Sequence, residues 1–216
     1  MKKVWLIFLF VHSLFIPLAY TQVDPKADKI IKSSRKKMNS YNDMTSDFIW
    51  TMENKATQQA PSVKKGKIYI KKEKYKIVFQ EREMFCDGKN LWDYLKKEKE
   101  VNLSKNNPKE GMNFQRVFKM YDEGMKVKYN ATELIGGVNT HKITLFPIEE
   151  KEFFKVELWI EEKTENIRKI KIHNRNGTTH QFEMNNIAAN TNLTDDIFVF
   201  DINKYPGVEL IDLRED

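Results

Sequence analysis

The sequence predicts a mainly β (α+β) fold: a large, strongly curved antiparallel sheet or barrel with two helices available to cover its concave side. Short segments in which apolar and polar residues alternate recur along most of the chain, with turn residues between them. Two other stretches carry apolar residues at helical spacing. The 216 residues are 40% hydrophobic and include only 8 Gly, 6 Pro and 1 Cys, so we expect one domain held together by packing and not by disulfides.

The N-terminus has the pattern of a secretory signal peptide. Two lysines precede an apolar stretch at residues 4–16, and small residues before position 22 offer a cleavage point. The stretch is shorter than the roughly 20 apolar residues of a membrane-spanning helix, and Pro17 ends it. We therefore expect residues 1–21 to be removed and residues 22–216 to form the mature domain, with no cysteine near its start to carry a lipid anchor.

The mature chain begins with a predicted helix. Asp24 followed by Pro25 is typical of a helix N-terminus, where a carboxylate caps free backbone N–H groups and proline takes the first helical position. The stripe that follows at helical spacing comprises Ala27, Ile30, Ile31, Ser34 and Met38. Asn39 and Ser40 end the pattern, and a stripe this narrow must lie against another element.

Strand patterns fill most of the remaining chain. The predicted strands are residues 48–52, 67–71, 75–79, 84–86, 91–94, 127–131, 141–146, 153–160, 167–173, 180–187 and 197–201. In the first of them, Phe48, Trp50 and Met52 alternate onto one face. Turn pairs such as Asp87-Gly88 between successive segments favour an antiparallel meander.

A second helix is predicted after Asn107-Pro108. Its apolar residues, few of them β-branched, are Met112, Phe114, Val117, Phe118, Met120 and Tyr121. The pattern ends near Gly124, and this helix can join the first one in covering the concave side of the sheet.

The sequence lacks the residue patterns of common catalytic and metal sites. It contains no G-x-S-x-G, no H-E-x-x-H and no catalytic cysteine signature, and Cys86 lies in an apolar strand pattern typical of a buried side chain. His141, His173 and His180 fall on three different predicted strands, where hydrogen-bonded roles are typical. We therefore expect no enzyme, no catalytic residue, no metal and no cofactor.

Charge and bulky apolar residues favour a lipid ligand. The formal net charge of +6 is scattered among Lys-Lys and Lys-Glu pairs, which argues against nucleic-acid binding and leaves attraction to an anionic membrane surface open. The chain carries 14 Phe, 9 Met, 8 Tyr and 4 Trp. Most of these must fill a core, but a curved sheet that helices cover incompletely favours a cavity for flexible apolar ligands.

Three segments carry motifs that occur together in a known family. Residues 66–72 read G-K-I-Y-I-K-K, residues 85–94 read F-C-D-G-K-N-L-W-D-Y, and residues 198–212 contain F-V-F and then P-G-V. They resemble, in order, the G-x-L-x-V-K-R-P strand, the S-D-G-K-x-L-W-x-Y hairpin and the F-x-F…P-x-G-V-x-V-x-D ending of the LolA family, the periplasmic carriers of outer-membrane lipoproteins. The order and spacing of the motifs over nearly all of the mature chain carry the resemblance.

The resemblance implies an incomplete antiparallel barrel, lidded by helices, that holds the acyl chains of a lipoprotein. Residues 22–216 would form this LolA-like domain and act as a monomer in the periplasm of a Gram-negative-type bacterium. The implied partners are acylated lipoprotein cargo, an inner-membrane Lol-type ABC transporter and an outer-membrane acceptor. Keeping one acyl chain of about 15 methylenes from water is worth on the order of 12 kcal/mol, at about 0.8 kcal/mol per CH₂, so the cargo needs a carrier but no covalent chemistry.

The predicted acyl-chain cavity combines strand and lid residues. They are Phe48, Trp50, Ile68, Ile70, Tyr75, Ile77 and Phe79 on strands and Met112, Phe118 and Met120 on the lid. Alternation fixes which side chains share a face of the sheet but not which face points inward. The competing interpretation is that these side chains only fill a closed core.

The predicted lid tether departs from the family pattern. In the family, the arginine of the K-R-P motif donates hydrogen bonds to the backbone of the lid, and the matching residue is Lys72, followed by Glu73 where proline is usual. Lysine keeps the charge but lacks the planar fork of donors. We expect a looser tether with the same role; the alternative is a solvated lysine.

Two other functions fit the same sequence. A related half-barrel can be a periplasmic sensor that binds lipoprotein or glycolipid and passes a signal to a partner protein. A secreted lipid hydrolase would depend on Cys86 or on one of the histidines.

Overall fold

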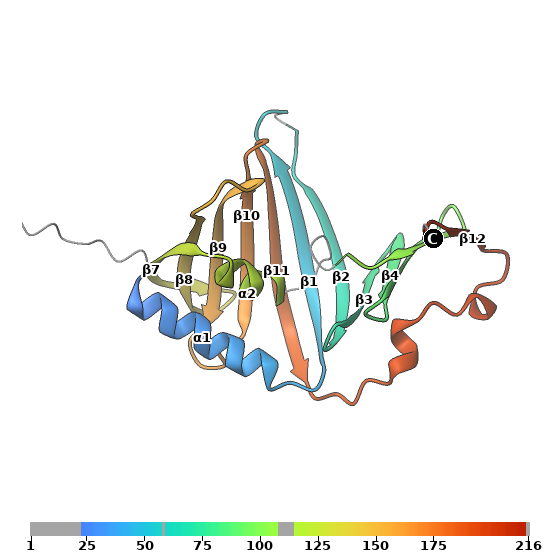
Figure 1. The fold of residues 1–216 in the computed structure, drawn as a ribbon, viewed down its shortest axis with the longest axis horizontal. Coiled ribbons are helices and arrows are strands. Elements are labelled where there is room, and N and C mark those ends of the chain that lie inside the picture. The colour runs from blue at the N-terminus through green and yellow to red at the C-terminus, as the bar shows by residue number, and fades with distance from the viewer. Residues whose placement is uncertain (1–22, 58, 108–114, 215–216) are drawn as a thin grey trace, which may run out of the picture.

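A single curved β-sheet dominates the computed structural model, which describes residues 23–57, 59–107 and 115–214 (Figure 1). Its strands are β1 (Met44–Asn54), β2 (Ser62–Lys71), β3 (Lys74–Phe79), β4 (Arg82–Cys86), β5 (Asn90–Leu95), β6 (Glu100–Lys105), β7 (Met125–Ile135), β8 (Val138–Pro147), β9 (Phe153–Glu161), β10 (Ile167–Asn174), β11 (Thr178–Ala189) and β12 (Glu209–Asp212). The order across the 12-stranded sheet is β12-β6-β5-β4-β3-β2-β1-β11-β10-β9-β8-β7. Neighbouring strands pair antiparallel except for β12, which runs parallel to β6. The predicted mainly β class is confirmed; the predicted signal peptide lies outside the described residues.

Helix α1 (Pro25–Asn39) crosses one face of the sheet and confirms the first predicted helix (Figure 1). The Asp24 carboxylate accepts hydrogen bonds from the backbone N–H groups of Lys26, at 2.9 Å, and Ala27, at 3.3 Å, as expected for an N-cap. Its second oxygen accepts a bond from the Tyr129 N–H at 3.1 Å, and the Asp24 N–H donates to the Val127 carbonyl at 3.1 Å. One residue therefore both starts α1 and fixes it to strand β7.

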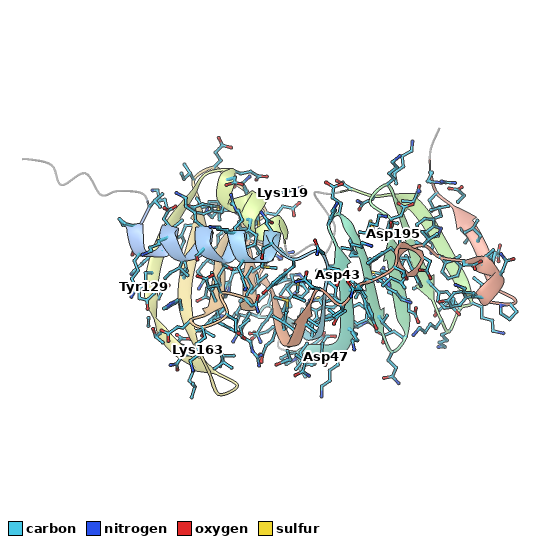
Figure 2. The ribbon with its side chains drawn as sticks, turned by 90° about the horizontal axis from the view of Figure 1, so that it is seen from below. Asp43, Asp47, Lys119, Tyr129, Lys163 and Asp195 are labelled. Atoms are coloured by element: carbon cyan, nitrogen blue, oxygen red, sulfur yellow. The ribbon has the colours of Figure 1, made fainter. Side chains whose placement is uncertain are left out.

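The second predicted helix corresponds to α2 (Gln115–Asp122). It lies beside α1, as the position of Lys119 next to α1 shows in the view from below (Figure 2). Its side chains Val117, Phe118 and Met120 are buried in the main core. Among the described residues, neither α1 nor α2 is long and apolar enough to cross a membrane.

The predicted strand at residues 197–201 is wrong. Asp195–Phe198 form a 3-10 helix, η1, and a second one, η2, spans Ile202–Lys204. Phe198 and Phe200 are both buried. The alternation of apolar residues in this segment therefore comes from side chains that pack against the sheet, and the segment itself is not a strand of it. The pattern also misses β6 and β12, in which few apolar residues alternate among polar ones.

The sheet buries apolar residues on both of its faces. The main core contains Ala27 and Ile31 of α1 together with inward-facing residues of nine strands and α2. A second cluster on the opposite face joins Phe85 and Val101 to Phe200, with Tyr94 and Tyr205 packed against them. Through Phe200, this cluster holds the chain after β11, which runs past β3 and β4 toward β12 (Figure 1).

Candidate functional site

The predicted strand residues of the cavity meet in the main core. Phe48, Ile68, Ile70, Tyr75, Ile77 and Phe79 come from the neighbouring strands β1, β2 and β3, and each is 1–7% exposed. They share one cluster with the buried side of α1, so this face of the sheet is the one that the helices cover. The structure thereby supplies the inward direction that strand alternation leaves open.

Trp50 lies at the margin of this core. Its ring is half-buried, 6.2 Å from the Phe79 ring and stacked on Phe182 at 6.1 Å between centroids. The indole N–H donates to Nδ1 of His180 at 3.3 Å, so that ring nitrogen must be an acceptor. Burial lowers the pKa of His180, which favours the neutral imidazole that this bond requires. The stacked rings of Trp50 and Phe182 therefore form an apolar surface next to the buried core.

The lid residues fall partly within the described chain. Phe118 and Met120 of α2 are buried in the main core, whereas Met112 lies outside the described residues. Polar contacts also join α1 to α2. Arg35 donates to the Phe118 carbonyl and to the Asp122 carboxylate, each at 2.8 Å, and the Tyr121 hydroxyl donates to the Asp28 carboxylate.

Lys72 lies in the turn between β2 and β3 and is exposed, with a left-handed φ of 55°. Its neighbours Lys71 and Lys74 bind the Asp195 carboxylate at 2.9 and 2.7 Å, on the segment that follows β11. The guanidinium that donates to the lid backbone belongs to Arg35 on α1. Arg35 is thus a lid contact that the sequence does not reveal, since its helical position alone does not identify its partner. The role of Lys72 as a tether stays a prediction.

Replacing Arg35 by methionine is expected to loosen α2. Methionine keeps an apolar stem over Phe118 and Tyr121 but removes a charge-assisted hydrogen bond to the helix backbone, worth about 1.5–3 kcal/mol. Amide hydrogen exchange of α2 should become about 10-fold faster or more, since 1.4 kcal/mol is a factor of ten. Lys72→Ala is the matched comparison: faster exchange in that variant alone would assign the tether to Lys72 and contradict the role of Arg35.

The other wall of the core comes from strands that the cavity prediction did not include. Its buried residues on β7–β11 are Met125, Val127, Ile143, Leu145, Phe153, Val156, Leu158, Ile160, Ile167, Ile170 and Met184. Their alternation is visible in the sequence, but the wall they form depends on long-range pairing of β1 with β11. The apolar interior therefore extends across most of the covered face.

The polar candidates have structural partners. Cys86 is buried, and burial raises the pKa of its thiol, which opposes formation of a reactive thiolate. His173 bonds to Glu157 at 2.6 Å, and His141 lies 3.6 Å from Glu162. Among residues 23–57, 59–107 and 115–214, no group of three His, Cys, Asp or Glu side chains is placed to hold a metal ion.

Comparison with known proteins gives one family and several structures of similar fold. Residues 39–201 match the family of the outer membrane lipoprotein carrier protein LolA. An uncharacterized conserved protein from Thermus thermophilus is 11% identical with a TM-score of 0.54, over 87% of this chain and 99% of that one. The lipoprotein LppX of Mycobacterium tuberculosis is 14% identical with a TM-score of 0.52, over 80% of this chain and all (100%) of that one. These two structures support the fold alone, and no curated protein matches the chain in sequence.

Proposed function

The chain belongs to the LolA family of outer membrane lipoprotein carrier proteins, and from this premise we propose that it carries lipoproteins from the inner to the outer membrane. The acyl chains would lie between the sheet and helices α1 and α2. One observation carries the proposal: apolar side chains of β1, β2 and β3 converge on the same covered face as those of α2. That arrangement can shield hydrocarbon from water, which is the physical requirement of transport.

The partners follow from this role. The leader at residues 1–21 would direct the chain to the periplasm, where residues 22–216 would act as a monomer. Acylated lipoprotein would be received from an ABC transporter of the Lol type in the inner membrane and passed to an acceptor in the outer membrane. Cys86 does not support the hydrolase alternative, because the residue is buried and burial raises the pKa of its thiol.

The described apolar interior is largely shielded from water, so acyl chains would enter by displacing the lid. The predicted cavity residues on β1–β3 and α2, Trp50 apart, are at most 7% exposed, which means that their side chains pack against one another. The Arg35–Asp122 ion pair costs little to open because the Asp122 side chain is 58% exposed, and exposed pairs contribute about 0–1 kcal/mol. Opening the lid would also break the bond from Arg35 to the Phe118 carbonyl, whereas the apolar contacts of α2 are ones that bound acyl chains can replace.

A brominated lipopeptide provides the direct test, because bromine quenches indole fluorescence on contact. Trp50 borders the proposed site, whereas Trp92 belongs to the second cluster and Trp159 lies on the outer face between Lys142 and Lys169. In single-tryptophan variants of the mature chain, saturating lipopeptide should quench most of the emission of Trp50 and leave that of Trp159 unchanged. Equal quenching of Trp50 and Trp159 would contradict an acyl site under the helices.

Transport itself requires a cellular test. Depletion of the protein in its native cell should leave lipoproteins in the inner membrane when the two membranes are fractionated. Normal sorting together with a stable complex between the protein and a regulatory partner would favour the sensor alternative.

A further inference from the structure

Two buried hydroxyl groups in the covered interior have no hydrogen-bond partner in good geometry. They are Oη of Tyr75, a residue that is 3% exposed on β3, and Oγ of Ser34, which is 0% exposed on the inner side of α1. The other partnerless buried atoms among the described residues are Nε atoms of Arg35 and Arg168, whose terminal nitrogens do have partners. Each arginine thus still makes a hydrogen bond through its guanidinium. Tyr75 and Ser34 differ, because the hydroxyl is the single polar group of the side chain.

Their positions make these groups unusual. Tyr75 follows the same inward alternation as Ile77 and Phe79 and lies in the apolar main core. Ser34 shares the buried side of α1 with Ala27 and Ile31. A buried hydroxyl without a partner destabilises the fold, and phenylalanine or alanine would fill the same space without that cost. The sheet and the helix thus each present one free donor to the space where the acyl chains are proposed to lie.

The surroundings of Tyr75 keep its hydroxyl protonated. Burial, together with the adjacent Cys86 thiol, raises the pKa of Tyr75, and burial also raises the pKa of Cys86. The Cys86 thiol lies close enough to interact with the hydroxyl, but a thiol is a weak acceptor, the pair does not have good hydrogen-bond geometry, and the sulfur already accepts a bond from the Gly88 N–H at 3.4 Å. The phenol therefore remains a neutral donor with unused capacity.

We propose that Tyr75 and Ser34 donate hydrogen bonds to the ester carbonyls that link the acyl chains of the ligand to glycerol. This inference rests on the proposed function and specifies which polar part of the ligand the interior recognises. A neutral carbonyl suits a hydroxyl donor in an apolar site, whereas a carboxylate or phosphate there would bear a large desolvation cost. Ligand binding would satisfy both donors and so help to offset the displacement of the lid.

The test compares two synthetic lipopeptides that differ only in the linkage of the chains. One carries ester-linked acyl chains on its glyceryl cysteine, and the other carries ether-linked alkyl chains of equal length. For Tyr75→Phe we expect about 5–10-fold weaker binding of the ester form, the value of one net hydrogen bond, and unchanged binding of the ether form. Ser34→Ala should have the same selective effect, and Tyr69→Phe on the neighbouring strand is the matched control because Tyr69 lies on the opposite face.

The possible results are distinguishable. Equal losses for both lipopeptides, or no loss for either, would overturn ester recognition while leaving an acyl-chain site intact. Failure of the unmodified protein to bind either lipopeptide would reject the proposed function and this inference together. Denaturant unfolding of Tyr75→Phe provides an independent readout: its stability should equal or exceed that of the parent, because the lost hydroxyl has no partner in the closed state. A further measurement replaces the lipopeptide by a free diacylglycerol. Tighter binding of the lipopeptide than of the diacylglycerol would identify the ester-bearing ligand as a lipoprotein.

Discussion

Replacing Phe198 by alanine is expected to lower the free energy of unfolding by about 3–5 kcal/mol, the usual cost of removing a fully buried phenylalanine. The side chain is 0% exposed, and the η1 turn that carries it packs against β3 and β4. Truncation of a fully buried ring leaves a cavity that its surroundings fill only in part. Urea unfolding of the mature protein would measure the change.

Val199→Ala is the matched control for this experiment. Val199 is the next residue in the chain and is 41% exposed, so its truncation should cost less than about 1 kcal/mol. A loss at Phe198 no larger than the loss at Val199 would show that the segment after β11 contributes little to the fold. In that case, the packing of Phe200 in the second cluster would also contribute little to stability.

The strands could be predicted where one face of the sheet is buried. Segments such as 75–79 and 153–160 alternate because their inward side chains enter the main core, and both are strands. The segment after β11 has the same alternation for another reason, since Phe198 is buried in a 3-10 helix and Phe200 packs in the second cluster with Phe85 and Val101. Local periodicity reports burial on one side, and only tertiary structure distinguishes a strand from an inserted loop.

The site could be predicted in composition but not in geometry. Alternation groups Phe48 with Trp50 and Ile68 with Ile70, but the inward direction requires knowing where α1 lies. The bond from Arg35 to the Phe118 carbonyl joins residues 83 positions apart, which no local pattern encodes. The free hydroxyls of Tyr75 and Ser34 are likewise invisible in the sequence, because a missing partner is a property of the packed structure.

The second large effect is expected at Asp43, which anchors the segment after β11. This residue precedes β1 and is 4% exposed, and in the view from below it lies beyond the end of α1 (Figure 2). Its carboxylate accepts bonds from the Thr191 N–H at 2.6 Å, the Thr191 hydroxyl at 2.8 Å and the Leu193 N–H at 3.1 Å. Asp43→Ala leaves these buried donors without their acceptor and should cost about 2–4 kcal/mol at pH 7.

The pH dependence of that loss identifies the charged form. Burial by itself would raise the pKa of Asp43, but the hydrogen bonds from Thr191 and Leu193 outweigh it, and the pKa falls below the ordinary value of 3.8. A group whose pKa is lower in the folded state stabilises the fold above its unfolded pKa and loses that contribution as the pH falls through the folded value. The stability difference between parent and Asp43→Ala should therefore be constant near neutral pH and shrink below about pH 4.

Two further variants separate the charge from the position. Asp43→Asn keeps an acceptor oxygen but cannot titrate, so its stability should depend less on pH in the acidic range than that of the parent. Asp47→Ala removes a nearby carboxylate with a single bond, to the Asn186 amide at 2.9 Å, and should cost clearly less than Asp43→Ala. If the parent and Asp43→Ala lose stability in parallel between pH 6 and pH 2, the ionised Asp43 does not hold the segment. Its attachment to the sheet would then rest on Phe198 and on the bonds of Lys71 and Lys74 to Asp195.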